Sequence, residues 1–226
     1  MEVTYYGHSC FQVNISGKKL LFDPFISANE LAEGIDIDAI SVDYILLSHG
    51  HQDHIADVES IYKHGKPQII STFEVVSWFE EKGLENTHAM NHGGSWKFDF
   101  GTVKMVNAVH SSSMPDGSYG GNPAGFVVTN ADKAFYYAGD TALHYDMKLI
   151  DEEFNIDFAF LPIGDNFTMG VNDAVKAAKF VGTSKVLGMH FDTFPPIKLD
   201  HHQAKSAFQN EGTELVLMGI GETINL

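Results

Sequence analysis

Six consecutive residues, His49 to His54, place three imidazoles and one carboxylate in the sequence His-Gly-His-Gln-Asp-His. Neutral imidazole nitrogens and carboxylate oxygens are the usual protein ligands of zinc and similar divalent metals. Four such side chains within six positions cannot all point away from one another. We therefore predict that this segment, the histidine loop, binds metal. A solvated polar loop is the alternative, and the density of ligand-type side chains argues against it.

The flanking sequence indicates that the histidine loop joins a strand to a helix. The apolar run Tyr44–Leu47 before it is typical of a buried strand. From Ile55 to Lys63, apolar residues recur at helical spacing. A helix starting near Asp53 and His54 would favour a carboxylate there, because the backbone N–H groups of its first turn are unpaired.

Length and composition describe a chain that can form its own core. The 226 residues, 44% of them apolar, are enough for a sizeable core and argue against disorder. No linker, charge run or low-complexity tract divides the chain, so we expect one domain over residues 1–226. The single cysteine, Cys10, excludes an intrachain disulfide and leaves metal binding to histidines and carboxylates.

Charge and hydropathy narrow the choice of partners. The net charge of −16 disfavours nucleic acid, whose binding depends on neutralising phosphates with lysine and arginine. An anionic substrate stays compatible, since bound dications would reverse the local field. The first residues lack a signal-peptide pattern, and no apolar run has membrane-spanning length. We expect a cytoplasmic protein with a small-molecule substrate and no nucleic-acid or membrane partner, and leave a homo-oligomer open.

Short apolar or alternating runs predict strands, and apolar positions at helical spacing predict helices. The predicted strands are Glu2–Tyr6, Phe11–Ile15, Lys19–Phe22, Tyr44–Ser48, Gln68–Ser71, Trp96–Phe98, Val103–Ala108, Gly125–Thr129, Ala134–Tyr137, Phe158–Pro162, Lys185–Met189, Glu214–Leu217 and Thr223–Asn225. The predicted helices are Ile55–Lys63, Phe73–Lys82, Val171–Val181 and Ala204–Asn210. Gly17 with Lys18 indicates a hairpin turn. Antiparallel strands with helices outside them suggest a layered α/β sandwich.

Four ligand-type residues stand just past the ends of predicted strands, namely His49, His110, Asp140 and His190. Strand ends at one edge of a sheet are rigid mounts, and loops at such edges commonly carry function. One such residue would mean little, but four are hard to assign to packing. We therefore predict that they meet the histidine loop in a larger metal site.

These residues, in this order and rough spacing, resemble the metallo-β-lactamase superfamily. The resemblance runs from about Thr4 to the C-terminus and rests on Asp23, the histidine loop, His110, Asp140 and His190. The segments Tyr6–Phe11, Leu21–Pro24, Pro162–Gly170 and Gly188–Phe191 are similar to a narrower group of metal-dependent hydrolases without an agreed substrate, near the ascorbate-phosphate lactonase branch. The resemblance implies a four-layer αββα sandwich, the metallo-β-lactamase fold, with the metals at one edge of two sheets.

The resemblance also implies a division of ligands between two metals. The first metal would take His49, His51 and His110, the second Asp53, His54 and His190, and Asp140 would bridge them. Three imidazoles suit zinc and leave a tetrahedral position for water, whose pKa falls to roughly 7 on the metal. A second metal ~3.5–4 Å away lets one hydroxide bridge both. We expect two divalent ions, with zinc favoured and manganese, nickel or iron as alternatives.

The resulting hypothesis is a dinuclear metal-dependent hydrolase. A metal-bridging hydroxide would attack an ester-like bond of a small metabolite, such as a lactone or a phosphodiester. One alternative is a mononuclear iron oxygenase of the same fold, which keeps a similar histidine loop. The other is a non-catalytic metal-binding or sensor protein, although a closed structural site needs only four ligands and seven are offered here.

Three residues are expected to take part in catalysis. Asp53 would do so as a ligand of the second metal. Asp23 would orient a ligand histidine through its ring N–H, with a turn-forming aspartate before Pro24 as the alternative. His8 would donate a hydrogen bond to substrate or a proton to a leaving group, with a buried structural histidine as the alternative.

Two loops are expected to shape the substrate pocket. Ser111–Pro123 follows a predicted ligand and is rich in small residues. Asp165, Thr168 and Met169 belong to a segment shared with the narrower group, so we expect them at the pocket as well, with a plain turn marked by Asn166 and Gly170 as the alternative.

Overall fold

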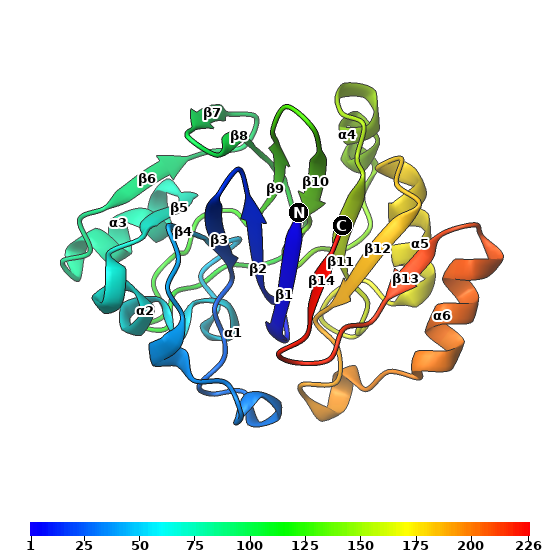
Figure 1. Cartoon of the computed structure of the whole chain (residues 1–226), viewed down its shortest axis with the longest axis horizontal. Coiled ribbons are helices and arrows are strands. Elements are labelled where there is room, and N and C mark those ends of the chain that lie inside the picture. Colours follow the sequence, from blue (N-terminus) through cyan, green and yellow to red (C-terminus); the bar gives the residue numbers. More distant parts are fainter.

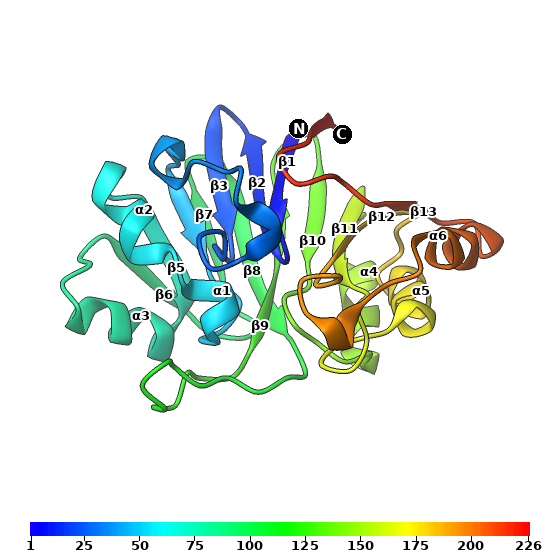
Figure 2. The ribbon, with the colours of Figure 1, turned by 90° about the horizontal axis from the view of Figure 1, so that it is seen from below.

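Two β-sheets lie face to face in the computed structural model, which describes all residues 1–226 (Figure 1). Helices α1–α3 cover one outer face and helices α4–α6 the other, as the view along the sheet edges shows (Figure 2). The four-layer αββα sandwich expected from the sequence is confirmed. No helix combines the length and apolar character needed to cross a bilayer.

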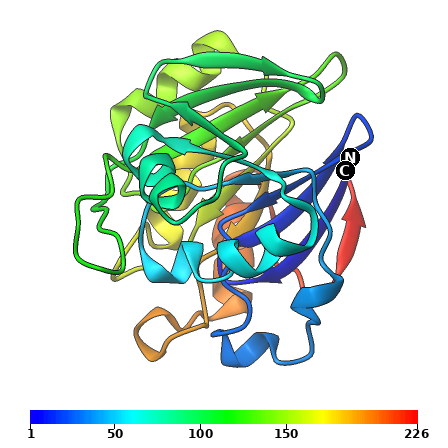
Figure 3. The same ribbon diagram turned by 90° about the vertical axis from the view of Figure 1, so that its left-hand side faces the viewer.

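The first sheet has seven strands in the order β14-β1-β2-β3-β4-β5-β6. Their bounds are β1 (Glu2–Gly7), β2 (Cys10–Ile15), β3 (Lys18–Phe22), β4 (Tyr44–Leu46), β5 (Gln68–Thr72), β6 (Thr87–Met90) and β14 (Thr223–Asn225). Pairs from β14 to β3 are antiparallel, and pairs from β3 to β6 are parallel. The predicted hairpin turn joins β2 to β3, with Ser16 and Gly17 at positive φ. Strand β14 lies beside β1, so the chain ends are adjacent (Figure 3).

The second sheet has the order β13-β12-β11-β10-β9-β8-β7. Its strands are β7 (Ser95–Phe98), β8 (Gly101–Asn107), β9 (Ala124–Thr129), β10 (Ala134–Tyr137), β11 (Phe158–Pro162), β12 (Lys185–Met189) and β13 (Glu214–Val216). Pairs from β7 to β10 are antiparallel, and pairs from β10 to β13 are parallel. The expected antiparallel arrangement therefore holds for only half of the pairs in each sheet. The helices supply the crossover connections that parallel neighbours require.

Six helices cover the sheets: α1 (Gln52–Ile55), α2 (Val58–Gly65), α3 (Phe73–Glu81), α4 (Lys148–Glu153), α5 (Val171–Phe180) and α6 (His201–Asn210). The 3₁₀ turns are η1 (Glu30–Ala32), η2 (Ile37–Ala39), η3 (Tyr145–Met147) and η4 (Pro195–Ile197). The predicted helix Ile55–Lys63 is wrong in one respect, because it is broken between α1 and α2. The Asp57 carboxylate at the break accepts the backbone N–H groups of Ile26 (2.5 Å) and Ser27 (3.0 Å), and so anchors the loop after β3.

Aromatic rings fill the space between the two sheets. Phe22 of the first sheet stacks on Tyr137 of the second with ring centroids 4.6 Å apart, and Phe11 lies 4.6 Å from Phe160. These rings belong to one buried cluster of 45 residues that spans both sheets. A smaller cluster of 17 residues lies largely beneath α2 and α3. Since the inter-sheet packing fixes the sheets against each other, it also fixes where their strand ends meet.

Candidate metal centre

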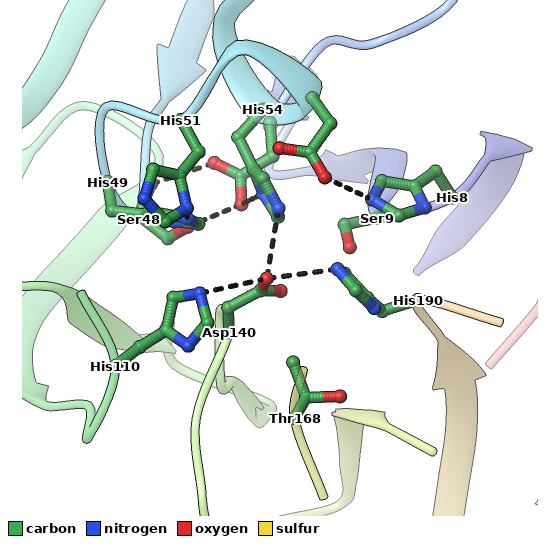
Figure 4. A network of polar contacts seen from close by, with 12 residues as sticks. His8, Ser9, Ser48, His49, His51, His54, His110, Asp140, Thr168 and His190 are labelled. Carbon is green, nitrogen blue, oxygen red and sulfur yellow. Dashed lines mark hydrogen bonds and ion pairs between the residues drawn. The ribbon is translucent and has the colours of Figure 1, made fainter. Parts of the chain in front are cut away.

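The predicted ligands converge from both sheets at the strand ends. The carboxylate of Asp140, which follows β10, stands at the middle of the group (Figure 4). Its Oδ2 lies 3.0 Å from His190 Nε2, 3.3 Å from His54 Nε2 and 3.6 Å from His110 Nε2. His54 comes from the histidine loop of the first sheet, whereas His110 and His190 follow strands of the second. The convergence expected of the strand-end residues is therefore present.

The ligand-type side chains form three overlapping groups, in each of which the ligand atoms lie within 4.8 Å of one another; one joins Asp23 to His49 and His54, and the other two divide the predicted ligands. Of these two, the first contains His49, His51 and His110, and the second contains Asp53, His54, His190 and also His8. Asp140 contacts His110 of the first group and both His54 and His190 of the second. The grouping matches the division of ligands that the family resemblance implied, with His8 as an additional neighbour.

Unpartnered buried atoms indicate that these residues fit a cation. His54 Nε2, Asp140 Oδ1 and His190 Nδ1 are all buried without a hydrogen-bond partner. His54 Nδ1 lies 2.8 Å from Asp23 Oδ2 and must carry the ring hydrogen, because an ionised carboxylate only accepts. The Nε2 lone pair of a neutral His54 then faces Asp140 Oδ2, another acceptor. Two buried acceptors face each other stably only if a proton or a metal ion lies between them.

The electrostatics of the group are also those of a cation site. Burial lowers the pKa of His49 well below its usual range, so its ring is neutral and able to bind metal. Burial alone would raise the pKa of Asp140, but His190 and His54 more than offset this and hold it well below its usual range. Burial likewise opposes a charge on His54, yet Asp140, Asp23 and Asp53 raise its pKa well above normal. A divalent ion would compete with that proton for the same negative charge.

Asp23 is fully buried directly after β3 and supports the histidine loop from beneath. Its Oδ1 accepts the backbone N–H of Ser48 (2.7 Å), and its Oδ2 accepts the Ser48 hydroxyl (2.6 Å) and His54 Nδ1–H (2.8 Å). The Tyr137 hydroxyl lies 2.8 Å from the same oxygen. The contact with a ligand-type histidine is the one that the sequence analysis expected of Asp23, although this aspartate is also a structural hub.

Ser48 extends the influence of Asp23 to the first group. Its single hydroxyl hydrogen points to Asp23, so its Oγ accepts from His49 Nδ1, which lies 2.9 Å away. This leaves His49 Nε2 as the free lone pair, 2.9 Å from His51 Nδ1. One carboxylate therefore sets the ring tautomer of one histidine in each group, directly for His54 and through Ser48 for His49.

Replacing Ser48 by alanine should weaken metal binding at the first group by about 10- to 100-fold, because His49 loses the acceptor that fixes its tautomer. Titration of the metal-free variant with zinc, followed by calorimetry, measures the loss. Ser71→Ala is the matched control, since Ser71 is equally buried and its hydroxyl donates to Leu47 O (2.7 Å) without touching the site. Equal zinc affinities in the two variants would contradict the relay through Ser48.

His8 lies behind the site, where its side chain is 0% exposed. Its Nε2 is 3.3 Å from Asp53 Oδ2, and its Nδ1 is 2.9 Å from Thr193 Oγ1. Burial lowers the pKa of His8 to about 4, so the ring is neutral and donates through Nε2–H to the ionised Asp53. The rings of Phe25 and Phe194 pack against it at 5.5 Å. His8 does not line the cavity, and its burial and contacts are those of the structural histidine given as the alternative.

A cavity of about 420 Å³ opens onto the centre. It is lined by His51, Asp53, His110, Ser111, Asp140, Phe167, His190, Phe194 and Pro196. Asp165, Thr168 and Met169 are not among the lining residues, whereas the neighbouring Phe167 is. Phe194 and Pro196 were not anticipated, and their only signal in the sequence is that they follow closely after the strand-end residue His190.

The loop Ser111–Pro123 reaches the cavity with Ser111 alone. Its other contacts support the histidine loop from the side. Gly50 N donates to Ser112 Oγ (3.1 Å), and a Cβ at Gly50 would lie only 2.4 Å from Met114 Sδ. A larger residue at position 50 would therefore have to displace the Met114 side chain.

An αββα sandwich with histidines and aspartates gathered at one edge defines the class of this protein as a metal-dependent hydrolase of the metallo-β-lactamase fold. The family model described as "Beta-lactamase superfamily domain" matches residues 2–190, a range that contains all seven predicted ligands. Proteins named UPF0173 metal-dependent hydrolase, from Flavobacterium johnsoniae and Christiangramia forsetii, are each 52% identical over the full length of both chains. The chain belongs to the beta-lactamase superfamily and, within it, to the UPF0173 metal-dependent hydrolases.

A solved structure extends the likeness to the whole fold. Igni18, described as a novel metallo hydrolase from the hyperthermophilic archaeon Ignicoccus hospitalis, superimposes with a TM-score of 0.89. The match covers 99% of this chain and 97% of Igni18, at 32% sequence identity.

Proposed function

We propose that this hydrolase holds two divalent metal ions, with zinc favoured, and cleaves an ester-like bond of a small metabolite such as a lactone or a phosphodiester. His49, His51 and His110 would hold one ion, and Asp53, His54 and His190 the other. The observation that carries the proposal is the position of Asp140, whose Oδ2 lies within 3.6 Å of histidines from both groups. A site for a single ion would not need a shared carboxylate between two sets of imidazoles.

The metals would supply Lewis acidity, lowering the pKa of a water molecule toward neutrality and polarising the acceptor oxygen of the substrate. The cavity that would receive the substrate is lined by Asp53, Asp140 and His190. His8 and Asp23 do not line it and contact these ligands from the protein side: His8 contacts Asp53, and Asp23 contacts His54. We therefore assign both as positioning residues.

Two observations support hydrolysis over the alternatives. The relatives at 52% identity are named metal-dependent hydrolases, which disfavours an oxygenase. The ligand groups also open onto a cavity large enough for a small molecule, whereas a purely structural metal site is closed by its ligands.

Metal analysis tests the number of ions. We expect two equivalents of zinc in the purified, metal-loaded protein, because two complete groups of ligands are present. His110→Ala should hold about one equivalent less, whereas the exposed surface variant His64→Ala should keep both. Inductively coupled plasma mass spectrometry after gel filtration gives the ratio. A stable value of one equivalent or below in the unaltered protein, however metal is supplied, would overturn the dinuclear proposal.

Activity is tested by screening lactones, phosphodiesters and β-lactams in parallel. Each substrate is offered to protein loaded with zinc, manganese, nickel or iron, since imidazole and carboxylate accept all four. We expect lactone or phosphodiester cleavage that a chelator abolishes and added metal restores. Two bound equivalents without cleavage of any substrate in these classes would contradict the proposed reaction while leaving the metal count intact.

A further inference from the structure

The residues that line the cavity divide into two kinds. Four of the nine belong to the two ligand groups, a fifth is Asp140, and the other four are Ser111, Phe167, Phe194 and Pro196. Apart from these five predicted ligands, one hydroxyl is thus the only polar side chain that could meet a substrate. We name Phe167, Phe194 and Pro196 the apolar wall.

No cationic side chain lines the cavity. All 14 basic residues of this chain are lysines, since the sequence contains no arginine, and none of them is among the lining residues. Phosphate and carboxylate groups are normally recognised by arginine forks or by lysine. A second anionic group on a substrate, held away from the bound metals, would therefore meet only Ser111 and the apolar wall.

Phe167 is held in the open by the backbone around it. Its side chain is 53% exposed. The two residues before it, Asp165 and Asn166, both adopt left-handed φ values, 63° and 58°. Aspartate and asparagine adopt such values more readily than other non-glycine residues, and the two in succession turn the chain just before Phe167. Asp165 N donates to Met169 O (3.1 Å), and Met169 N donates to Thr141 O (3.1 Å). The loop tip is thereby tied to the segment that carries Asp140.

The other two residues of the apolar wall, Phe194 and Pro196, are held by their neighbours. The Phe194 ring packs against His8 at 5.5 Å and Phe25 at 6.2 Å, so it is fixed from behind. Pro196 belongs to η4, whose loop is closed by the backbone hydrogen bond from Asp192 N to Ile197 O (2.8 Å). The packed Phe194 ring and Pro196 therefore form a surface that needs little ordering when a ligand arrives, and the exposed Phe167 ring lies beside them.

We infer that the apolar wall selects substrates whose non-reacting part is uncharged and apolar, such as an alkyl or aryl substituent. This inference rests on the proposed hydrolysis of an ester-like bond and narrows its substrate class. It favours alkyl-substituted lactones and disfavours metabolites that carry an additional phosphate or carboxylate. The gain comes from covering the exposed Phe167 ring and its neighbours, because burial of apolar surface is favourable in proportion to its area.

Three γ-lactones test the inference on zinc-loaded protein: γ-butyrolactone, γ-octalactone and a γ-lactone with a carboxylate substituent. We expect kcat/KM for γ-octalactone to exceed that for γ-butyrolactone at least tenfold, and the carboxylate-bearing lactone to be poorest. Phe167→Ala should remove most of the octalactone advantage while changing butyrolactone less than twofold. Phe73→Ala is the matched control, because Phe73 is 62% exposed but lies on α3, outside the cavity.

Binding of the product acids separates this inference from the proposed reaction. By calorimetry, 4-hydroxyoctanoate should bind zinc-loaded protein at least tenfold more tightly than 4-hydroxybutyrate, and Phe167→Ala should reduce that ratio to near one. If this selectivity is present without lactone cleavage, the inference holds and the proposed bond is wrong. Equal binding of the two acids, a preference for the anionic lactone, or full selectivity in Phe167→Ala would overturn the inference even in an active hydrolase.

Discussion

Replacing Asp140 by asparagine should abolish hydrolysis, with kcat/KM falling by about 10³-fold or more. Loss of a residue that only orients a metal ligand typically costs about 10- to 100-fold, and a carboxylate shared by two ions should cost more. The Asp140 Oδ2 contacts His54, His110 and His190, and an amide there is neutral and can turn an N–H donor toward those rings. Bound metal should fall from two equivalents to one or fewer, as measured by mass spectrometry alongside the rate.

The fold of the metal-free Asp140→Asn protein should persist. Asp140 Oδ1 has no partner and Oδ2 contacts only imidazoles, so no backbone donor is left unpaired by the change. We expect the free energy of unfolding to fall nonetheless, because Asp140 raises the pKa of the buried His54 and a neutral amide no longer balances the charge of that ring. Asp157→Asn is the control. Asp157 accepts the backbone N–H of Ala134 (2.8 Å) at the start of β10, the strand that leads to Asp140, and it is in none of the metal groups. Two bound equivalents with near-normal activity in Asp140→Asn would remove the bridging assignment.

The sequence predicts the helices and strands that form the layers, because the spacing of apolar residues and the length of apolar runs can be read locally. It does not predict the break between α1 and α2, since the apolar spacing runs through it unchanged. The break depends on Asp57 accepting backbone N–H groups some 30 residues earlier in the chain. Strand β6 and helix α4 are likewise missed, because β6 is short with one buried residue and α4 buries only Ile150. Both depend on packing against the rest of the fold.

The candidate site, like the fold, can be predicted from the sequence only in part. Metal ligands are predictable because their chemistry restricts them to a few residue types, and strand ends tell where they gather. The partners of His8 are not predictable, since Thr193 lies 185 positions away and Asp53 lies 45 positions away. The apolar wall cannot be predicted either, because nothing in the sequence distinguishes the exposed Phe167 from the many phenylalanines of the core. Substrate preference therefore needs the structure, whereas the presence of a metal site does not.

Replacing Asp23 by asparagine should damage both the stability of the metal-free protein and its affinity for metal. The amide oxygen will take the place of Oδ2, where Ser48 Oγ, His54 Nδ1 and Tyr137 OH converge. The amide NH₂ then faces the backbone N–H of Ser48 at the Oδ1 position, 2.7 Å away, so two buried donors oppose each other. We expect the free energy of unfolding to fall by about 2–3 kcal/mol, measured by urea denaturation of chelator-treated protein.

The metal affinity of Asp23→Asn should fall by about 10- to 100-fold. The Asp23 carboxylate fixes the ring tautomer of His54 directly and that of His49 through Ser48, and a neutral amide fixes both less strongly. Tyr137→Phe is the graded control: it removes one of the contacts to Oδ2 and should cost about 1 kcal/mol with little change in zinc affinity. The two aspartates differ in one testable respect: Asp140→Asn should lose metal without unpairing a backbone donor, whereas Asp23→Asn should lose metal and also leave the buried Ser48 N–H without an acceptor. A metal-free Asp23→Asn protein as stable as the unaltered one would show that this carboxylate acts on the ligands alone and does not hold the strand ends together.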